Sequence, residues 1–183
     1  MTNPASSARS DETPPAPVEP APAGWEWAIL HTRPRAEKKA RGECERAGYP
    51  VFLPLRRKEH RYGGRLRVFW SPLFPGYVFG CFPSDQVRGL KSSDHVANVL
   101  PVVAQAELVR QLQQIQRALE AGEYLDVMPY LAKGKPVRIT SGPMKGVEGI
   151  VQSVDRKTRV VISIEMIQQS VFMEIDSAAV ELL

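Results

Sequence analysis

The chain has 183 residues, 43% of them hydrophobic, and a formal net charge of +4. This length allows one domain of ordinary size or two small ones. No apolar run approaches the roughly 20 residues of a membrane helix, and the proline-containing, charged N-terminus lacks the apolar stretch of a signal peptide. The two cysteines, Cys44 and Cys81, belong to no CxxC or Cys/His cluster. We therefore expect a cytoplasmic protein without membrane contacts, structural disulfides or a zinc site.

Positive charge is concentrated in one segment of the chain. Residues 24–83 hold twelve Lys/Arg and five Asp/Glu, residues 84–128 hold four and six, and residues 129–183 hold seven and six. A basic stripe of this kind attracts phosphate backbones or acidic protein surfaces. A solvated face that aids solubility is the alternative interpretation.

The first 23 residues are rich in Pro, Ala and Ser and contain almost no large apolar side chain. Such a segment cannot bury enough surface to offset the entropy of ordering, so residues 1–23 are predicted to form a disordered tail with polyproline character. A solubilising tail is the favoured interpretation, and a docking ligand is the alternative.

Residues 24–122 are predicted to form an α/β sandwich. The hydrophobic pattern indicates a mostly apolar first strand, an edge strand flanked by prolines, a hairpin around two glycines and two amphipathic helices. The predicted strands are 25–32, 49–55, 58–62, 65–69, 76–82 and 96–103. The predicted helices are 35–47, with Pro34 at its start, a short one from Ser84 to Leu90, and 107–121. Together they favour an antiparallel sheet with flanking helices.

The pattern changes after the last helix. Residues 123–135 carry little periodicity and are predicted to be a linker. Residues 136–183 contain short β-branched runs at 137–140, 147–154, 159–165 and 170–175, which predict a small antiparallel β-barrel. The expected fold class is therefore α+β, with two cores joined by a mobile connection.

No arrangement of residues indicates catalysis. The three histidines, His31, His60 and His95, lie far apart in the sequence, and none accompanies a Ser or Cys in a nucleophile motif. There is no Gly-rich phosphate loop, since Gly63-Gly64 is a hairpin turn. We therefore predict a monomeric binding protein with no catalytic residues, metal or cofactor.

The most informative stretch is Phe74-Pro75-Gly76-Tyr77, which places two aromatic rings beside a rigid kink at the start of a strand. Both rings could belong to the core. Alternatively, because the bend prevents all the large side chains here from facing one side, at least one ring borders an exposed apolar surface of the kind that anchors protein interfaces.

Several motifs resemble the NusG family of transcription factors. Trp27-Ala-Ile-Leu-His-Thr32, the Gly-Gly hairpin and Leu73-Phe-Pro-Gly-Tyr-Val-Phe79 are similar to the N-terminal NGN domain of that family. The segment Val137-Arg-Ile-Thr-Ser-Gly-Pro-Met-Lys-Gly-Val-Glu-Gly-Ile-Val151 looks like a KOW motif. This likeness implies that the C-terminal barrel is SH3-like. The likeness extends over about residues 25–182.

This resemblance implies a transcription elongation or antitermination factor that binds the clamp helices of the largest RNA polymerase subunit and suppresses pausing. By motif position, the polymerase-binding residues would be His31, Phe74, Pro75 and Tyr77. The basic residues next to upstream or non-template DNA would be Lys38 and Lys39 on the first helix and Arg61, Arg65 and Arg67 on the hairpin.

The resemblance also implies a partner for the KOW domain, either ribosomal protein S10 or Rho. The turn of its KOW motif would consist of Gly142, Pro143, Lys145 and Gly146, and the loop that contacts the partner would include Met166 and Ile167. Housekeeping members carry a Phe-Gly-Arg turn where this chain has Glu165-Met-Ile-Gln-Gln-Ser170, which looks more like specialised paralogues of the RfaH type. The choice between a housekeeping factor and a paralogue stays open, as does a fold switch of the KOW domain. A KOW-type RNA-binding or ribosome-associated protein is the alternative function.

Overall fold

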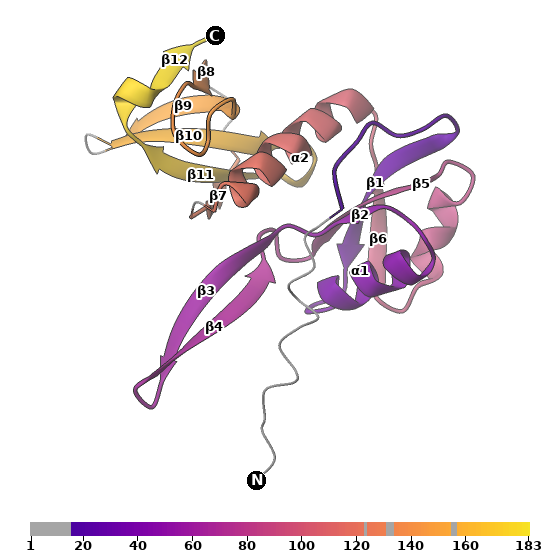
Figure 1. Ribbon diagram of the computed structural model, residues 1–183. Coiled ribbons are helices and arrows are strands. Elements are labelled where there is room, and N and C mark those ends of the chain that lie inside the picture. The colour runs from indigo at the N-terminus through magenta and orange to yellow at the C-terminus, as the bar shows by residue number, and fades with distance from the viewer. Residues whose placement is uncertain (1–15, 123, 131–133, 155–156) are drawn as a thin grey trace.

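The computed structural model describes residues 16–122, 124–130, 134–154 and 157–183. A four-stranded antiparallel sheet in the order β2-β5-β1-β6 organises the N-terminal half (Figure 1). Its strands are β1 (Trp25–Thr32), β2 (Val51–Phe52), β5 (Tyr77–Pro83) and β6 (Val96–Pro101). The apolar strand β1 lies inside the sheet and the proline-flanked β2 lies at its edge, as the sequence predicts.

One helix covers each face of this sheet. On one face, Ala40 and Cys44 of α1 (Glu37–Arg46) share a hydrophobic cluster with Leu30 of β1. On the other face, α2 (Gln105–Glu120) shares a cluster with Ile29 of the same strand. The alternation of side chains along a strand produces this arrangement, because neighbouring residues point to opposite faces. The predicted sandwich of an antiparallel sheet with flanking helices is confirmed.

Two helix boundaries differ from the prediction. Helix α1 begins at Glu37 instead of following directly from Pro34, because Arg35 has a left-handed backbone with φ of 61° that a helix cannot include. Ser84 does not cap a helix. Its backbone N–H donates to the Gly24 carbonyl, and a 3-10 helix, η1 (Val87–Ser92), begins only three residues later.

A separate two-stranded ribbon projects from the body of the molecule (Figure 1). It consists of β3 (Leu55–Tyr62) and β4 (Arg65–Pro72), and both arms extend further than predicted. The turn residues Gly63 and Gly64 have φ of 55° and 79°, the positive values that a tight hairpin turn requires and that glycine adopts without strain.

The C-terminal half is a six-stranded antiparallel sheet in the order β12-β8-β9-β10-β11-β7. Its strands are β7 (Asp126–Pro129), β8 (Lys135–Ile139), β9 (Glu148–Val154), β10 (Lys157–Ile164), β11 (Gln169–Ile175) and β12 (Val180–Leu182), with short 3-10 helices η2 (Glu165–Ile167) and η3 (Ser177–Ala179). Strand β7 lies within the segment predicted as a linker. It forms because Val127 pairs with Val171 on the edge of the sheet. The SH3-like closure of this sheet stays a prediction.

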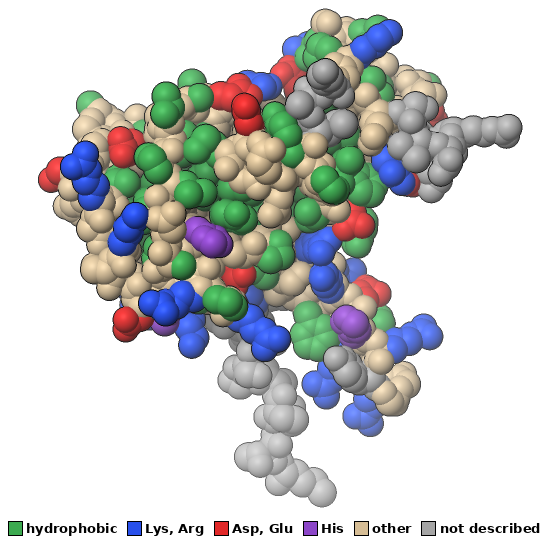
Figure 2. Space-filling view, turned by 180° about the vertical axis from the view of Figure 1, so that it is seen from behind, with side chains coloured by type: hydrophobic (Ala, Val, Ile, Leu, Met, Phe, Trp, Pro, Cys, Tyr) green, Lys and Arg blue, Asp and Glu red, His purple; other side chains and the backbone are tan. Residues whose placement is uncertain are grey.

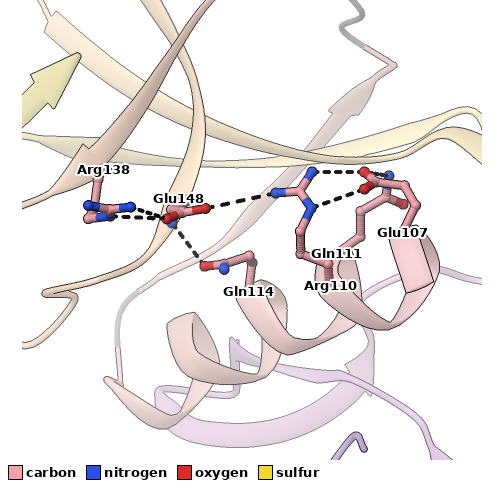
Figure 3. Close-up of polar contacts among 6 residues, drawn as sticks. All are labelled: Glu107, Arg110, Gln111, Gln114, Arg138 and Glu148. Atoms are coloured by element: carbon pink, nitrogen blue, oxygen red, sulfur yellow. Dashed lines mark hydrogen bonds and ion pairs between the residues drawn. The ribbon is translucent and has the colours of Figure 1, made fainter. Parts of the chain in front are cut away.

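Helix α2 lies between the two sheets and contacts both (Figure 1). Its residue Leu112 belongs to the same buried cluster as Val137 and Val160 of the C-terminal sheet. At the junction, the backbone N–H of Glu148 donates to Gln114 Oε1 at 2.9 Å (Figure 3). The Glu148 carboxylate also lies 3.9 Å from Arg110 of α2. The two halves therefore share buried contacts, and their independence as domains stays a prediction.

Part of the predicted disordered tail packs against helix α2. Residues 1–15 lie outside the described residues, whereas residues 16–22 run along α2. Val18 is 4% exposed and joins the core cluster. The prediction of disorder over residues 1–23 is wrong for this part, because one apolar side chain and its backbone groups find partners on α2. No helix within the described residues is long and apolar enough to cross a membrane.

Candidate protein-binding site

Strands β1 and β5 bring two of the predicted binding residues together. His31 and Tyr77 are directly opposite in the antiparallel register. Their rings stack, with centroids 5.2 Å apart and planes inclined by 26°. His31 is exposed and Tyr77 is half-buried, and the exposed Pro75 precedes Tyr77 at the turn. These three side chains form a surface that we call the His31–Tyr77 patch.

The turn before β5 is held by contacts from two other elements. Gly76 has φ of 87°, and a Cβ atom placed on it would lie 3.7 Å from the His31 ring. Its N–H donates to the buried carboxylate of Glu37 at 2.8 Å, and its carbonyl accepts from the Thr32 N–H at 2.8 Å. Since both backbone groups of Gly76 are fixed, the neighbouring Pro75 and Tyr77 are positioned before any partner arrives.

Phe74 does not lie on this surface. It is fully buried and packs edge-to-face against Phe79, with ring centroids 6.1 Å apart. The Pro-Gly bend places Phe74 in the core and leaves Tyr77 half-buried at the surface, so one of the two rings borders the surface, as the bend predicts. The prediction that Phe74 lies on an exposed binding patch is therefore wrong, because its ring is part of the core.

The two faces of the β3–β4 ribbon differ in chemistry. Residues that pair across an antiparallel ladder point to the same face. Arg65 and Arg67 therefore share one face with Lys58, His60 and Phe69. Arg61 pairs with Leu66 and lies on the opposite face, together with Arg57, Glu59, Val68 and Trp70. The three arginines predicted to act together are thus divided between a basic face and a face that mixes apolar and charged side chains.

The ribbon is not covered by the described part of the chain along most of its length. All side chains from 57 to 61 and from 65 to 70 are exposed, including Leu66 at 55% and Trp70 at 40%. Figure 2 shows Lys and Arg side chains around the projecting ribbon with hydrophobic side chains between them. Lys38 and Lys39 are exposed on α1, and the tip of the ribbon lies well away from that helix (Figure 1). The predicted basic residues therefore form two separate groups.

The C-terminal candidates also divide between surface and core. In the turn between β8 and β9, Pro143 and Lys145 are exposed while Met144 between them is buried. The N–H of Gly146 donates to the Ile139 carbonyl at 2.8 Å, and Gly142 accepts from the Lys145 N–H at 3.2 Å. In the predicted partner loop, Met166 is 39% exposed, but Ile167 is buried in the core. Only Met166 of that pair is available to a partner.

The two cysteines are buried and free. Burial raises the pKa of the Cys44 thiol to about 11, with the charges of Glu43 and Glu45 adding to the effect. Burial also raises the pKa of Cys81. Neither thiol is therefore activated as a nucleophile. Within the described ranges, no group of three or more His, Cys, Asp or Glu side chains could hold a metal ion.

Sequence reasoning missed the role of the glutamines on α2. Gln105 donates to the Trp27 carbonyl and accepts from the Trp27 N–H, Gln113 and Gln116 bind the backbone of Val18, and Gln114 binds that of Glu148. The many glutamines on this amphipathic helix could have indicated these contacts, because a buried amide side chain requires polar partners.

The chain matches the family model for NusG, described as transcription termination factor nusG, over residues 25–148. This match covers the antiparallel sheet, both helices, the ribbon and the first strands of the C-terminal sheet, which is more than half of the chain. The chain belongs to the NusG family of transcription factors.

Among solved structures, the chain is similar to a chain described as "Crystal Structure of MjSpt4:Spt5 complex conformation B", with 16% sequence identity and a TM-score of 0.28. The match covers 86% of this chain and 96% of that chain. At this TM-score the likeness adds nothing to the family assignment. No curated protein matches the chain significantly.

Proposed function

We propose that this protein is a transcription elongation factor that binds the clamp helices of RNA polymerase through the His31–Tyr77 patch and suppresses pausing. The observation that carries the proposal is the stacked pair itself. An aromatic ring on a fixed turn loses little freedom on binding and supplies a large contact area, as interface hot spots do. An exposed apolar patch of this kind suits the apolar stripe of a helix.

The basic face of the ribbon, with Arg65 and Arg67, borders nucleic acid in this proposal. Its charge and its projection from the body (Figure 2) support a contact with the phosphate backbone of upstream or non-template DNA. Lys38 and Lys39 on α1 form a second basic group for the same purpose. These contacts supply sequence-independent, salt-sensitive attraction, while the His31–Tyr77 patch supplies the specific protein contact.

The C-terminal sheet recruits a second protein, either ribosomal protein S10 or Rho, through Met166 and the exposed turn residues Pro143 and Lys145. The exposure of Met166 supports this part of the proposal. Methionine adapts to varied apolar partners because its side chain is unbranched and polarisable. A pull-down comparing Met166→Ala with the unaltered chain, scored for S10 and Rho, tests it. If the Met166→Ala chain retains both proteins at unchanged levels, Met166 is not part of the contact.

The polymerase contact is tested by Tyr77→Ala and a matched control. Tyr77→Ala is expected to weaken binding to a coiled-coil peptide of the clamp helices by about 2 kcal/mol, the size of an aromatic hot spot. Tyr124→Ala removes an equally large aromatic ring that is 66% exposed elsewhere and is expected to bind normally. Both variants must keep the melting temperature of the unaltered chain. Equal binding by a folded Tyr77→Ala chain would refute the proposal.

A further inference from the structure

The segment of residues 16–22 is preset to an extended conformation by its sequence, Ala-Pro-Val-Glu-Pro-Ala-Pro. Every residue in it except Val18 is either a proline, whose φ is fixed near −65°, or precedes a proline and is held in the extended region. A polyproline II helix has three residues per turn, so Val18 and Ala21 lie on one side of it. That side faces the protein: Val18 is buried in the core cluster, and Ala21 packs against it.

The backbone of this segment is bound by three side chains from two elements. The Val18 carbonyl accepts from Gln113 Nε2 at 2.9 Å, and the Val18 N–H donates to Gln116 Oε1 at 2.9 Å. The next carbonyl, that of Glu19, accepts from the indole Nε1 of Trp27 at 2.9 Å. Successive carbonyls of the segment therefore meet donors from α2 and from β1.

This chemistry matches the needs of a polyproline II ligand. Such a helix makes no internal hydrogen bonds, so its carbonyls are free to accept from a protein, and its preset conformation keeps the entropic cost of binding low. Trp27 is only 2% exposed and its indole nitrogen is a donor only. A buried donor without an acceptor is costly, so the site favours an occupant that supplies a carbonyl at this point.

We propose that Gln113, Gln116 and Trp27 form a binding site for proline-rich peptides, which the chain's own residues 16–22 occupy in this structure. The site accepts an extended peptide with a small branched apolar side chain, a second small apolar residue three positions later and prolines between or beside them.

The test uses the full chain carrying Val18→Asp, which puts a charge in the buried position and releases the chain's own segment. A fluorescent peptide of residues 14–23 is titrated into it and its anisotropy is measured. We expect saturable binding to the variant and at least tenfold weaker binding to the unaltered chain, because a tethered segment competes at a high effective concentration. The same peptide with Val18→Asp is expected to bind at least tenfold more weakly.

A second set of variants locates the site. Adding Gln113→Ala and Gln116→Ala to the Val18→Asp chain is expected to reduce peptide affinity at least tenfold, while adding Gln111→Ala, which changes a neighbouring glutamine bonded to Glu107, leaves it unchanged. If the Val18→Asp chain is unstable, recovery of its melting temperature by the peptide replaces anisotropy as the readout. Absence of both binding and recovery, or binding that is indifferent to Gln113 and Gln116, overturns the proposal.

Discussion

Helix α2 and the β3–β4 ribbon belong to the same half of the molecule but differ in how their side chains are used. On α2, the apolar face packs into the core and four glutamines bind backbone groups of other segments. On the ribbon, Leu66, Val68 and Trp70 are 55%, 42% and 40% exposed. The apolar side chains and these glutamines of the helix therefore find their contacts within the chain. The ribbon carries both apolar and basic side chains for which the described part of the chain offers little cover.

This difference indicates where partners bind. An isolated two-stranded ribbon is only marginally stable in water, and exposed apolar side chains in a group are typical of interaction surfaces. One ribbon contact stabilises its base: Arg56 lies 2.7 Å from Asp126 of β7. We infer that substitutions on α2 change stability first, whereas substitutions on the ribbon and on the His31–Tyr77 patch change binding first.

The largest expected effect follows truncation of the buried face of α2. Leu112 is fully buried, and Leu112→Ala should lower the free energy of unfolding by about 2–5 kcal/mol through lost burial and the remaining cavity. Leu66→Ala makes the same chemical change on the exposed ribbon and should cost no more than about 0.5 kcal/mol. Urea denaturation of both variants measures the contrast. A Leu66→Ala chain as destabilised as Leu112→Ala would show that the ribbon is covered in solution.

The second effect concerns the junction between α2 and the C-terminal sheet. Gln114→Ala leaves the backbone N–H of Glu148 without its acceptor, and we expect a loss of about 1–3 kcal/mol. Gln111→Ala, one turn away, removes only a hydrogen bond to Glu107 and should cost less than half as much. Thermal unfolding compares them. If Gln114→Ala unfolds like the unaltered chain, the junction does not persist in solution and the halves behave as independent domains.

The third effect belongs to the basic face of the ribbon. Replacing both Arg65 and Arg67 by Ala should weaken DNA binding and reduce the slope of log affinity against log salt by about 2, since each phosphate contact contributes about one. Arg117→Ala on the exposed side of α2 removes one charge of the same kind and serves as the control. Binding to a DNA fork at several salt concentrations gives both slopes. An unchanged slope for the ribbon variant would place the DNA elsewhere.

The smallest effect is a dependence of stability on pH. Hydrogen bonding from Arg110 lowers the pKa of Glu107 below its usual 4.5. A carboxyl with a lowered folded-state pKa stabilises the protein above its unfolded pKa, and this contribution disappears as the pH falls through the folded value. Because the Glu107 side chain is 43% exposed, we expect about 0.5 kcal/mol or less.

Urea denaturation between pH 6 and pH 3 measures this contribution. Glu107→Gln should flatten the acid limb slightly relative to the unaltered chain. An acid limb that is identical in the Glu107→Gln and unaltered chains would mean that the Arg110 contact is not maintained in solution.

Much of the fold could be predicted because local patterns determine it. The apolar run of β1, the Gly63-Gly64 turn and the periodicity of α2 each define an element without reference to the rest of the chain. The bend at Pro75-Gly76 also predicts that at least one of the rings of Phe74 and Tyr77 borders the surface, but not that Phe74 is the buried one. The patterns failed where a distant segment supplied the partner. Val18 is ordered by Gln113 and Gln116, almost one hundred residues later, and β7 is a strand only because β11 lies beside it.

The division of the ribbon arginines between two faces could have been predicted. Alternation along the strand places Arg65 and Arg67 together, and the turn of Gly63-Gly64 sets the register that puts Arg61 opposite Leu66. The burial of Ile167 could not have been predicted, because the course of the chain at this point depends on Gln168, which adopts a left-handed φ of 53°. That conformation is uncommon for a residue other than glycine.

Amide hydrogen exchange of the chain, alone and bound to RNA polymerase, shows whether the polymerase covers the His31–Tyr77 patch and the ribbon. We expect new protection at His31 near the end of β1, at Gly76 and Tyr77 and along the ribbon, with exchange in α2 unchanged because its partners lie within the chain. New protection confined to α2 or the C-terminal sheet, with the His31–Tyr77 patch exchanging as in the free protein, would contradict this expectation.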